Sequence, residues 1–517
     1  MTEKTYSINF KKKPIFLNLA LFLTFILLGI FFLVFNRYQI NSDAIESFSM
    51  TLNLVKGNFY DFIHGYRSPL YSFLLAPFIL SGLEPLLSAK ILSIIVGFFI
   101  LLALKKTVRL MLQEEKLFFL ILFFTIPVLL YFMYSITNSD LLSSLFIIIF
   151  FNFFLDKDFK YTIKNGFLIG ITIGFGYLSK SFNLVFFIII IIIYLILDLI
   201  IKKIPFKKIL VFLSIVILMI LLIAGPWIAA ISYKFDKFSI STVGEVNYKM
   251  IGPNTAAEMA EINSHLLDIN TKEGFVNDDI TTFSNQLSSW FDIGYLFKKI
   301  VLNFLDTVKG FDKFKLTALS LIIILFIKGK EYINSIKMFI FYILYILGYS
   351  FLMIGYVDRF FYALILIGYI LCFKILLQIV DFKTLLKNKI VFIIVFLYIS
   401  ASFLATPLNY LPNSIKTKPD IQYYYAALEI KDLNIKGNVA SSSSGREMKY
   451  ITYYNREDMR YYGTTLNDSE LKEFDIDYYF CEKAYEEKYE ELVDSGTRLI
   501  GTIDNFYIFK TGYSLIE

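Results

Sequence analysis

The sequence predicts an all-α bundle of about eleven transmembrane helices, followed by a small C-terminal α/β domain. Hydrophobic residues make up 57% of the 517-residue chain, more than a soluble protein can hold while keeping a polar exterior. They also lie in blocks nearly free of charge, and most blocks approach the roughly 20 residues that a helix needs to cross a bilayer. The blocks lie at residues 15–35, 87–104, 117–134, 141–155, 183–200, 209–231, 316–327, 338–356, 360–380 and 390–406.

A further span is predicted at residues 165–180, which are short for a span and rich in glycine. Small residues let helices pack closely, so a buried, short span is expected there. The block at 15–35 is interpreted as a retained first span. Its apolar stretch is too long for a secretory signal, and no small-residue cleavage site follows it.

Loop charge predicts the orientation, because cytoplasmic loops carry an excess of Lys and Arg. The N-terminal segment is rich in lysine and basic clusters recur in every second connection, whereas residues 135–139 carry none. We therefore expect a multi-pass plasma-membrane protein with a cytoplasmic N-terminus. Residues 1–406 would form the transmembrane catalytic domain, and residues 407–517 a soluble extracytoplasmic α/β domain. The segments expected outside are 37–86, 232–312 and 407–517.

The outer segments are predicted to be structured. Residues 43–56 show helical spacing of apolar residues, with Ser42 as a cap. The apolar piece 70–80 is too short to span and suits an interfacial helix. In the C-terminal domain we expect a helix at 420–433, strands at 437–442, 447–454 and 477–481, a charged helix at 482–493 and a hairpin-like end at 497–510.

Acidic residues stand at the outer ends of predicted helices. Asp43 begins the first outer helix, Glu46 follows one turn later on the same face, and Asp140 opens the span 141–155. The helix dipole favours carboxylates at such positions. A capping role therefore explains Asp140 as well as a catalytic role does, and it explains Asp43 less well, because Ser42 could supply that cap.

Three cations share this outer face. Lys180 ends the glycine-rich span, Arg359 precedes a later span, and Arg67 lies in a Tyr-Arg-Ser-Pro turn flanked by Tyr66 and Tyr71. Each cation alone is explained by snorkelling, and the tyrosines by interface anchoring. Three cations beside two carboxylates would suit a ligand with an anionic head group held at the membrane surface.

Other kinds of site are not indicated. The two cysteines, Cys372 and Cys481, provide no disulfide framework. The two histidines occur without the HExxH or CxxC spacing of a zinc site, so we predict no structural metal. The net charge of +6 is typical of cytoplasmic loops in a membrane protein and does not indicate nucleic acid.

Several short stretches, taken in order, resemble the GT-C superfamily of polytopic glycosyltransferases. The nearest branch is glycosyltransferase family 39, which includes protein O-mannosyltransferases and aminoarabinose transferases. The likeness departs where Ala44 follows Asp43 in place of a second acidic residue, and the Trp-Trp-Asp signature of oligosaccharyltransferases is absent. The likeness covers about residues 10–380 and rests on Asn41-Ser42-Asp43, Arg67-Ser68-Pro69-Leu70-Tyr71, Thr137-Asn138-Ser139-Asp140, Gly176-Tyr177-Leu178-Ser179-Lys180, Pro226-Trp227 and Asp358-Arg359-Phe360.

The resemblance implies transfer of a sugar, with inversion, from a polyprenyl-phosphate donor to an acceptor hydroxyl on a protein, glycan or lipid. It implies Asp43 as general base. Asp140 would orient the acceptor or the base, or hold a divalent cation if one is used; no cofactor is otherwise expected. The donor arrives on its lipid, so no nucleotide-sugar site is needed. The residues implied in donor binding are Lys180, Arg359, Arg67, Tyr66, Tyr71 and Glu46.

Three other functions compete with this interpretation. A transporter or flippase for lipid-linked glycans should show inverted repeats and charges near the midplane, and the sequence shows no repeat. A glycan polymerase or ligase would use the same lipid-linked substrate. A binding or assembly protein would act through the C-terminal domain, where no site is evident.

Overall fold

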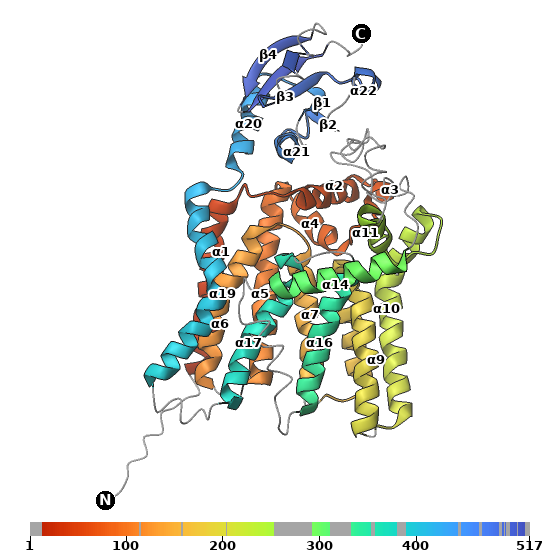
Figure 1. Ribbon diagram of the computed structural model, residues 1–517, viewed down its shortest axis with the longest axis vertical. Coiled ribbons are helices and arrows are strands. Elements are labelled where there is room, and N and C mark those ends of the chain that lie inside the picture. The colour runs from red at the N-terminus through yellow and green to blue at the C-terminus, as the bar shows by residue number, and fades with distance from the viewer. Residues whose placement is uncertain are drawn as a thin grey trace, which may run out of the picture.

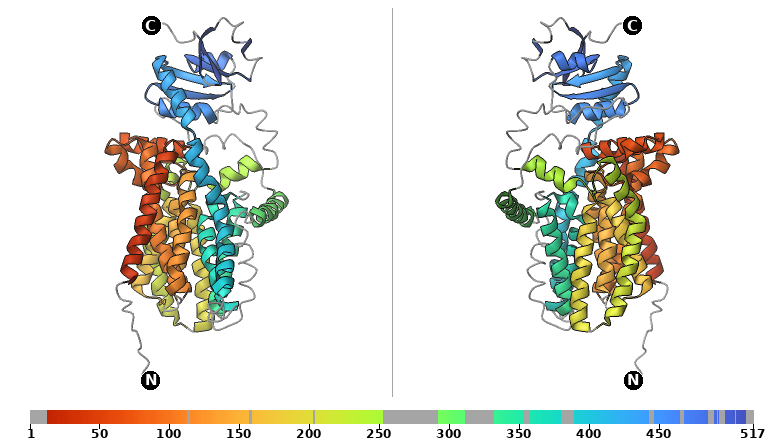
Figure 2. Two further views of the ribbon diagram at one scale, coloured as in Figure 1. Left: turned by 90° about the vertical axis from the view of Figure 1, so that its left-hand side faces the viewer. Right: turned by 90° about the vertical axis from the view of Figure 1, so that its right-hand side faces the viewer.

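The computed structural model is a bundle of long helices with a small five-stranded domain at one end (Figure 1). The N-terminal end of the first helix lies at the opposite end of the bundle, and both side views show the same arrangement (Figure 2). We call the end that carries the C-terminal domain the outer end. The structure describes residues 13–112, 115–156, 159–202, 204–252, 292–310, 332–352, 357–379, 389–442, 446–464, 468–484, 489–490, 492, 497–503 and 505–511.

Long helices occupy the predicted spans within the described part of the chain. Among these residues, six helices are long and apolar enough to cross a membrane, and α7 and α16 contain shorter apolar helices. The predicted span 316–327 lies outside the described residues. The helices of the bundle are α1 (Lys13–Asn36), α5 (Pro85–Met111), α6 (Glu115–Ser135), α7 (Asp140–Leu155), α8 (Ile163–Ser179), α9 (Phe182–Lys202), α10 (Phe206–Lys234), α16 (Tyr332–Phe351), α17 (Tyr362–Ile379) and α19 (Lys389–Thr417).

The glycine-rich helix α8 packs closely against α10. A Cβ added at Gly170 would lie 2.8 Å from the carbonyl oxygen of Val216, and one at Gly174 would lie 2.7 Å from the Cβ of Ile223. Backbones can approach this closely only where side chains are absent. The predicted close packing of this short helix is therefore confirmed.

Short helices gather at the outer end, where residues 37–86 fold (Figure 1). The cap of α2 is Asn41, so the prediction of Ser42 was wrong. The Asn41 side chain makes no cap hydrogen bond, because its oxygen accepts from the backbone N–H of Thr137 at 3.0 Å. The outer helices are α2 (Ser42–Lys56), α3 (Phe59–Phe62), α4 (Leu70–Leu80) and α11 (Val243–Ile251), and α14 (Ile293–Gly310) lies across the bundle.

The C-terminal domain is a mixed sheet with strand order β2-β1-β3-β5-β4. Strand β1 pairs in parallel with β2 and β3, whereas β3, β5 and β4 pair antiparallel, as expected for a hairpin-like end. Residues 482–493, predicted as a charged helix, lie largely outside the described residues. The elements are α20 (Ile421–Asp432), β1 (Gly437–Ser441), α21 (Arg446–Tyr454), β2 (Met459–Thr464), α22 (Asp468–Glu473), β3 (Tyr478–Glu482), β4 (Arg498–Ile503) and β5 (Phe506–Lys510).

The predicted strand at 447–454 was wrong, because these residues form helix α21. Parallel strands need a crossover connection, usually a helix, and α21 lies between the parallel strands β1 and β2. Met448 and Ile451, three residues apart, are both buried in the domain core. Tertiary packing thus outweighs the β-propensity of a run rich in tyrosine.

The domain docks on the loop that leads into α2. Helix α19 continues past residue 406 to Thr417, and the Asp420 carboxylate then accepts from the backbone N–H of Ile40 at 2.9 Å. The Tyr453 hydroxyl contacts Glu84 at the start of α5 and accepts from the N–H of Leu86 at 3.0 Å. The loop before α2 and the start of α5 are therefore hydrogen-bonded to the C-terminal domain.

Candidate active site

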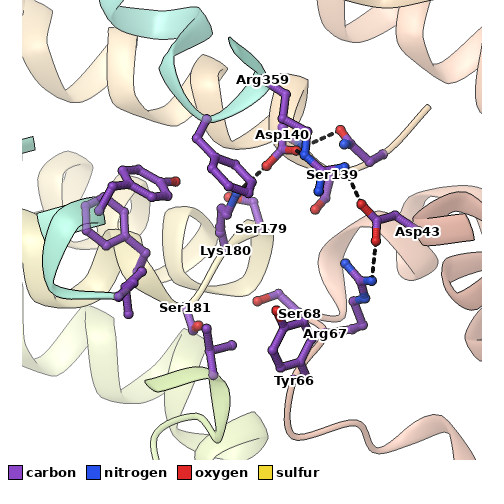
Figure 3. Close-up of a pocket in the computed structure, with 16 residues that line it drawn as sticks. Asp43, Tyr66, Arg67, Ser68, Ser139, Asp140, Ser179, Lys180, Ser181 and Arg359 are labelled. Carbon is purple, nitrogen blue, oxygen red and sulfur yellow. Dashed lines mark hydrogen bonds and ion pairs between the residues drawn. The ribbon is translucent and has the colours of Figure 1, made fainter. Parts of the chain in front are cut away.

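A small cavity of about 110 Å³ lies at the outer end of the bundle. Its charged lining comes from chain segments far apart in the sequence (Figure 3). Asp43 lies in the first turn of α2, Arg67 in the loop before α4, and Asp140 at the first residue of α7. Lys180 is the C-cap of α8, and Arg359 lies in the 3₁₀ helix η3 (Asp358–Phe361).

Asp43 is held between two guanidinium groups. Arg67 Nη2 lies 2.5 Å from Asp43 Oδ1, and Arg359 Nη1 contacts the other carboxylate oxygen. Burial alone would raise the pKa of Asp43, but the two positive charges outweigh it and hold that pKa well below its ordinary value. Asp43 is therefore ionised at neutral pH.

Asp140 is paired from two sides and is more deeply buried, with a side chain 7% exposed. Lys180 contacts Asp140 Oδ1, and Arg359 Nε lies 3.5 Å from Asp140 Oδ2. The Lys180 ammonium also lies 3.8 Å from the centre of the Phe360 ring, a cation–π contact. Arg359 thus joins the two carboxylates that the sequence predicted to be catalytic.

The charges form one alternating chain, because Arg67 also binds Glu46, with 2.5 Å between Nη2 and Oε2. Partly buried charges are tolerated only when they are paired, and each member here has an opposite partner. An anion entering the cavity would therefore compete with carboxylates for the same cations. The order along the chain is Glu46, Arg67, Asp43, Arg359, Asp140 and Lys180.

A fully buried lysine, Lys90, bonds to the two loops that precede the carboxylate-bearing helices α2 and α7. The Lys90 ammonium donates to Gln39 Oε1 at 2.5 Å and to Thr137 Oγ1 at 2.6 Å. Gln39 lies in the loop before α2, and Thr137 in the loop before α7. Because the backbone N–H of Thr137 also donates to Asn41 Oδ1, the two loops are tied together directly.

The structure brings most of the predicted site residues together. Asp43, Asp140, Lys180, Arg359, Arg67 and Tyr66 all line the cavity. Glu46 is not part of the lining and instead binds Arg67. Tyr71 is also absent from the lining and is buried in the helical core, 3% exposed.

Sequence reasoning missed several residues that the structure places here. Ser68, Asn138 and Ser139 line the cavity. Their positions beside Arg67 and Asp140 were visible in the motifs, but small polar residues in turns carry little signal of function. Lys90 was hidden inside an apolar span, where one lysine suggests only a residue near the interface.

The residues around Asp140 do not fit a divalent cation. Its two carboxylate oxygens face Lys180 and Arg359, whose positive charges would repel a metal ion. Within the described residues, no three His, Cys, Asp or Glu side chains are grouped as metal ligands.

No protein-family model matches the chain, and no curated protein sequence matches it. Solved structures do match. ArnT from Cupriavidus metallidurans, bound to undecaprenyl phosphate, superposes with a TM-score of 0.55 at 10% identity, covering 96% of this chain and 99% of that one. The oligosaccharyltransferase of Archaeoglobus fulgidus in its apo form gives a TM-score of 0.50 at 12% identity, covering 91% and 70%. The oligosaccharyltransferase AglB of the same organism, with an inhibitory peptide and a dolichol-phosphate, gives the same values.

These likenesses define the class of fold. The chain is a multi-pass membrane protein with the GT-C fold, as its ordered motifs predicted. The match to ArnT extends over nearly the whole of both chains.

Proposed function

We propose that this protein is a GT-C glycosyltransferase that moves a sugar from a polyprenyl-phosphate donor to an acceptor hydroxyl at the extracytoplasmic face. The observation that carries the proposal is the charged cavity, in which Arg67, Arg359 and Lys180 meet Asp43 and Asp140. A lipid-linked donor presents its phosphate at the membrane surface. An outer-end cavity with several cations is suited to hold that phosphate.

The chemistry of the leaving group explains why the cavity needs cations but no proton-donating acid. A polyprenyl phosphate departs as a stable anion, so no general acid is required. The cations need only offset the charge that develops on the phosphate oxygen. The lipid phosphates named with two of the similar structures, undecaprenyl phosphate and dolichol-phosphate, support this class of donor.

Asp43 is the proposed general base. The acceptor oxygen forms a bond to the anomeric carbon while the bond from that carbon to the phosphate oxygen breaks, which inverts the centre. The acceptor proton passes to the Asp43 carboxylate, and polyprenyl phosphate leaves. In the resting protein Arg67 and Arg359 make Asp43 a weak base. When the donor phosphate draws these guanidiniums toward itself, Asp43 becomes more basic.

Asp140 is proposed to orient the cations rather than to accept the proton. It is buried and holds both Lys180 and Arg359. Removing it would leave two cations without an anchor. We further propose that the cytoplasm lies at the N-terminal end of the bundle, from loop charge.

The test uses the purified protein in liposomes with a panel of polyprenyl-phosphate sugars and a mixture of glycan, peptide and lipid acceptors. We expect sugar-free polyprenyl phosphate to accumulate only when an acceptor is present. A flippase would move the intact donor across the bilayer without cleaving it. A polymerase would extend the glycan on its own lipid, so the length of the product separates that outcome. Donor translocation without cleavage would overturn the proposal.

A further inference from the structure

We propose that Asn138 binds the lipid-linked donor directly, its side-chain amide donating a hydrogen bond to an oxygen of the donor. This inference rests on the proposed function and adds a contact to it. Asn138 lies two residues before Asp140 and lines the same cavity.

The orientation of the amide is fixed by the backbone. Asn138 Oδ1 accepts from the N–H of Asp140 at 2.9 Å, the i to i+2 bond typical of an Asx turn. Only the oxygen of the carboxamide can accept from an N–H group. The amide nitrogen Nδ2 must therefore lie on the other side of the group, and flipping the amide would set two donors against each other.

Asn138 Nδ2 is buried and has no hydrogen-bond partner among the described residues. The residue as a whole is only 9% exposed. Buried polar groups in native proteins are almost always paired, so an orphan donor needs an explanation. Arg359 Nε, in the same cavity lining, makes no close hydrogen bond and has only the 3.5 Å ion pair with Asp140. The Asn138 amide is thus the unpaired donor of this lining, which indicates that an acceptor on a ligand completes it.

The loop cannot relax to pair the orphan amide within the protein. Thr137, the preceding residue, receives a bond from Lys90 at 2.6 Å and donates its N–H to Asn41 at 3.0 Å. Asp140, two residues on, begins α7 and is held by Lys180. Asn138 is therefore held between two anchored neighbours, as a preorganised binding residue should be.

A lipid-linked donor supplies the missing acceptor. Phosphate oxygens and sugar hydroxyls both accept hydrogen bonds, and the cations beside Asn138 would bring the phosphate to this place. A neutral N–H adds a directed contact without adding charge to a site whose cations are already paired. The amide thus serves to fix the position of the donor, whereas the cations neutralise it.

The test compares Asn138→Asp and Asn138→Ala. Aspartate keeps the oxygen that accepts from Asp140 N–H but loses the amide donor, and alanine loses both. Thr162→Ala is the matched control, because it removes a side-chain acceptor at the other end of the bundle, where Thr162 accepts from the N–H of Asn165 at 3.2 Å. Binding of undecaprenyl phosphate and the KM for the sugar-linked donor are measured for each variant in detergent, together with the thermal midpoint.

We expect both Asn138 variants to bind about ten-fold more weakly, as for the loss of one hydrogen bond to a charged group. Weaker binding of undecaprenyl phosphate assigns the contact to a phosphate oxygen. A raised KM for the sugar-linked donor, with undecaprenyl phosphate binding unchanged, assigns it to the sugar. Thr162→Ala should bind both ligands as the wild type does.

The inference is overturned if Asn138→Ala binds the donor like the wild type. Weak binding by Asn138→Asp alone would then reflect charge repulsion between the new carboxylate and the donor phosphate. It is also overturned if Asn138→Asp binds the donor like the wild type and Asn138→Ala shows only a lower thermal midpoint. That result would mean that Asn138 merely caps the turn before α7. If the alanine variant does not fold, Asn138→Ser, a neutral residue that keeps an acceptor, replaces it. A wild-type protein that binds no polyprenyl phosphate would overturn the proposed function together with this contact, whereas unchanged variants overturn the contact alone.

Discussion

Replacing Asp43 with asparagine separates catalysis from donor binding. The change keeps the shape of the side chain and removes one negative charge and the only proposed proton acceptor. Arg67 keeps Glu46 as a partner at 2.5 Å, and Arg359 keeps Asp140 at 3.5 Å. The two guanidiniums therefore remain in place when Asp43 is lost.

We expect Asp43→Asn to lower kcat strongly and to leave donor binding intact. General-base catalysis contributes about 10²- to 10⁴-fold, which is roughly 2.7–5.4 kcal/mol of barrier at 1.36 kcal/mol per decade. Donor affinity should stay constant or increase, because the phosphate no longer competes with Asp43 for Arg67 and Arg359. A unit charge 4 Å away contributes on the order of 4 kcal/mol at an effective dielectric of 20, and solvent at these partly exposed groups reduces that limit.

The assay follows release of polyprenyl phosphate from the sugar-linked donor, and donor binding is measured in the absence of acceptor. Glu46→Gln is the matched control: it makes the same carboxylate-to-amide change one turn along α2, on the same Arg67, outside the cavity lining. It should reduce kcat far less than Asp43→Asn. An Asp43→Asn protein with more than about a tenth of wild-type kcat would refute the role of base. Donor binding lost in parallel with kcat would instead show that Asp43 holds the site together.

Further predictions concern packing, pH and the buried lysine. Gly170→Ala should lower the unfolding free energy by about 1–3 kcal/mol in thermal or denaturant melts, because its Cβ meets backbone of α10. Gly244→Ala, at an exposed position of α11 where the added Cβ meets no other part of the protein within 4 Å, should be neutral or stabilise by about 0.5–1 kcal/mol. The pKa of Asp43 is lowered from 3.8, so its contribution to stability is present above pH 3.8 and lost as pH falls through the lower folded value. Melting curves from pH 6 down to pH 2 should show this loss beginning below pH 3.8 in the wild type and not in Asp43→Asn. Lys90→Met removes both bonds between this lysine and the loops before α2 and α7, so kcat should fall more than KM rises. Lys90→Arg should restore part of the lost kcat. Wild-type activity in Lys90→Met would contradict a role for these bonds in positioning the site.

The helical bundle could be read from the sequence because it depends on local properties, whereas the cytoplasmic side stays a prediction from loop charge. The length of an apolar block and the charge of the adjacent loop need no knowledge of distant contacts. The placing of Asp43 and Asp140 in first helical turns follows in the same way from local helix signals. Motif order then predicted the GT-C fold, which the similarity to solved structures confirmed.

Only the tertiary structure decided which charges meet. Arg359 and Asp43 are 316 residues apart, and their contact depends on how η3 packs against α7. The same holds for Tyr71, which shares a motif with Arg67 yet turns into the core, and for α21, whose tyrosine-rich run favours a strand in isolation.

Asn138 and Lys90 show the physical reason most clearly. A lone amide in a turn and a lone lysine in an apolar span have many local explanations. Their roles depend on their surroundings: the Asn138 amide is an unpaired N–H donor in the cavity lining, and the Lys90 ammonium bonds to two loops. The sequence thus determined that polar residues stand at the ends of the apolar helices, whereas burial and pairing in three dimensions decided which of them can act on a ligand.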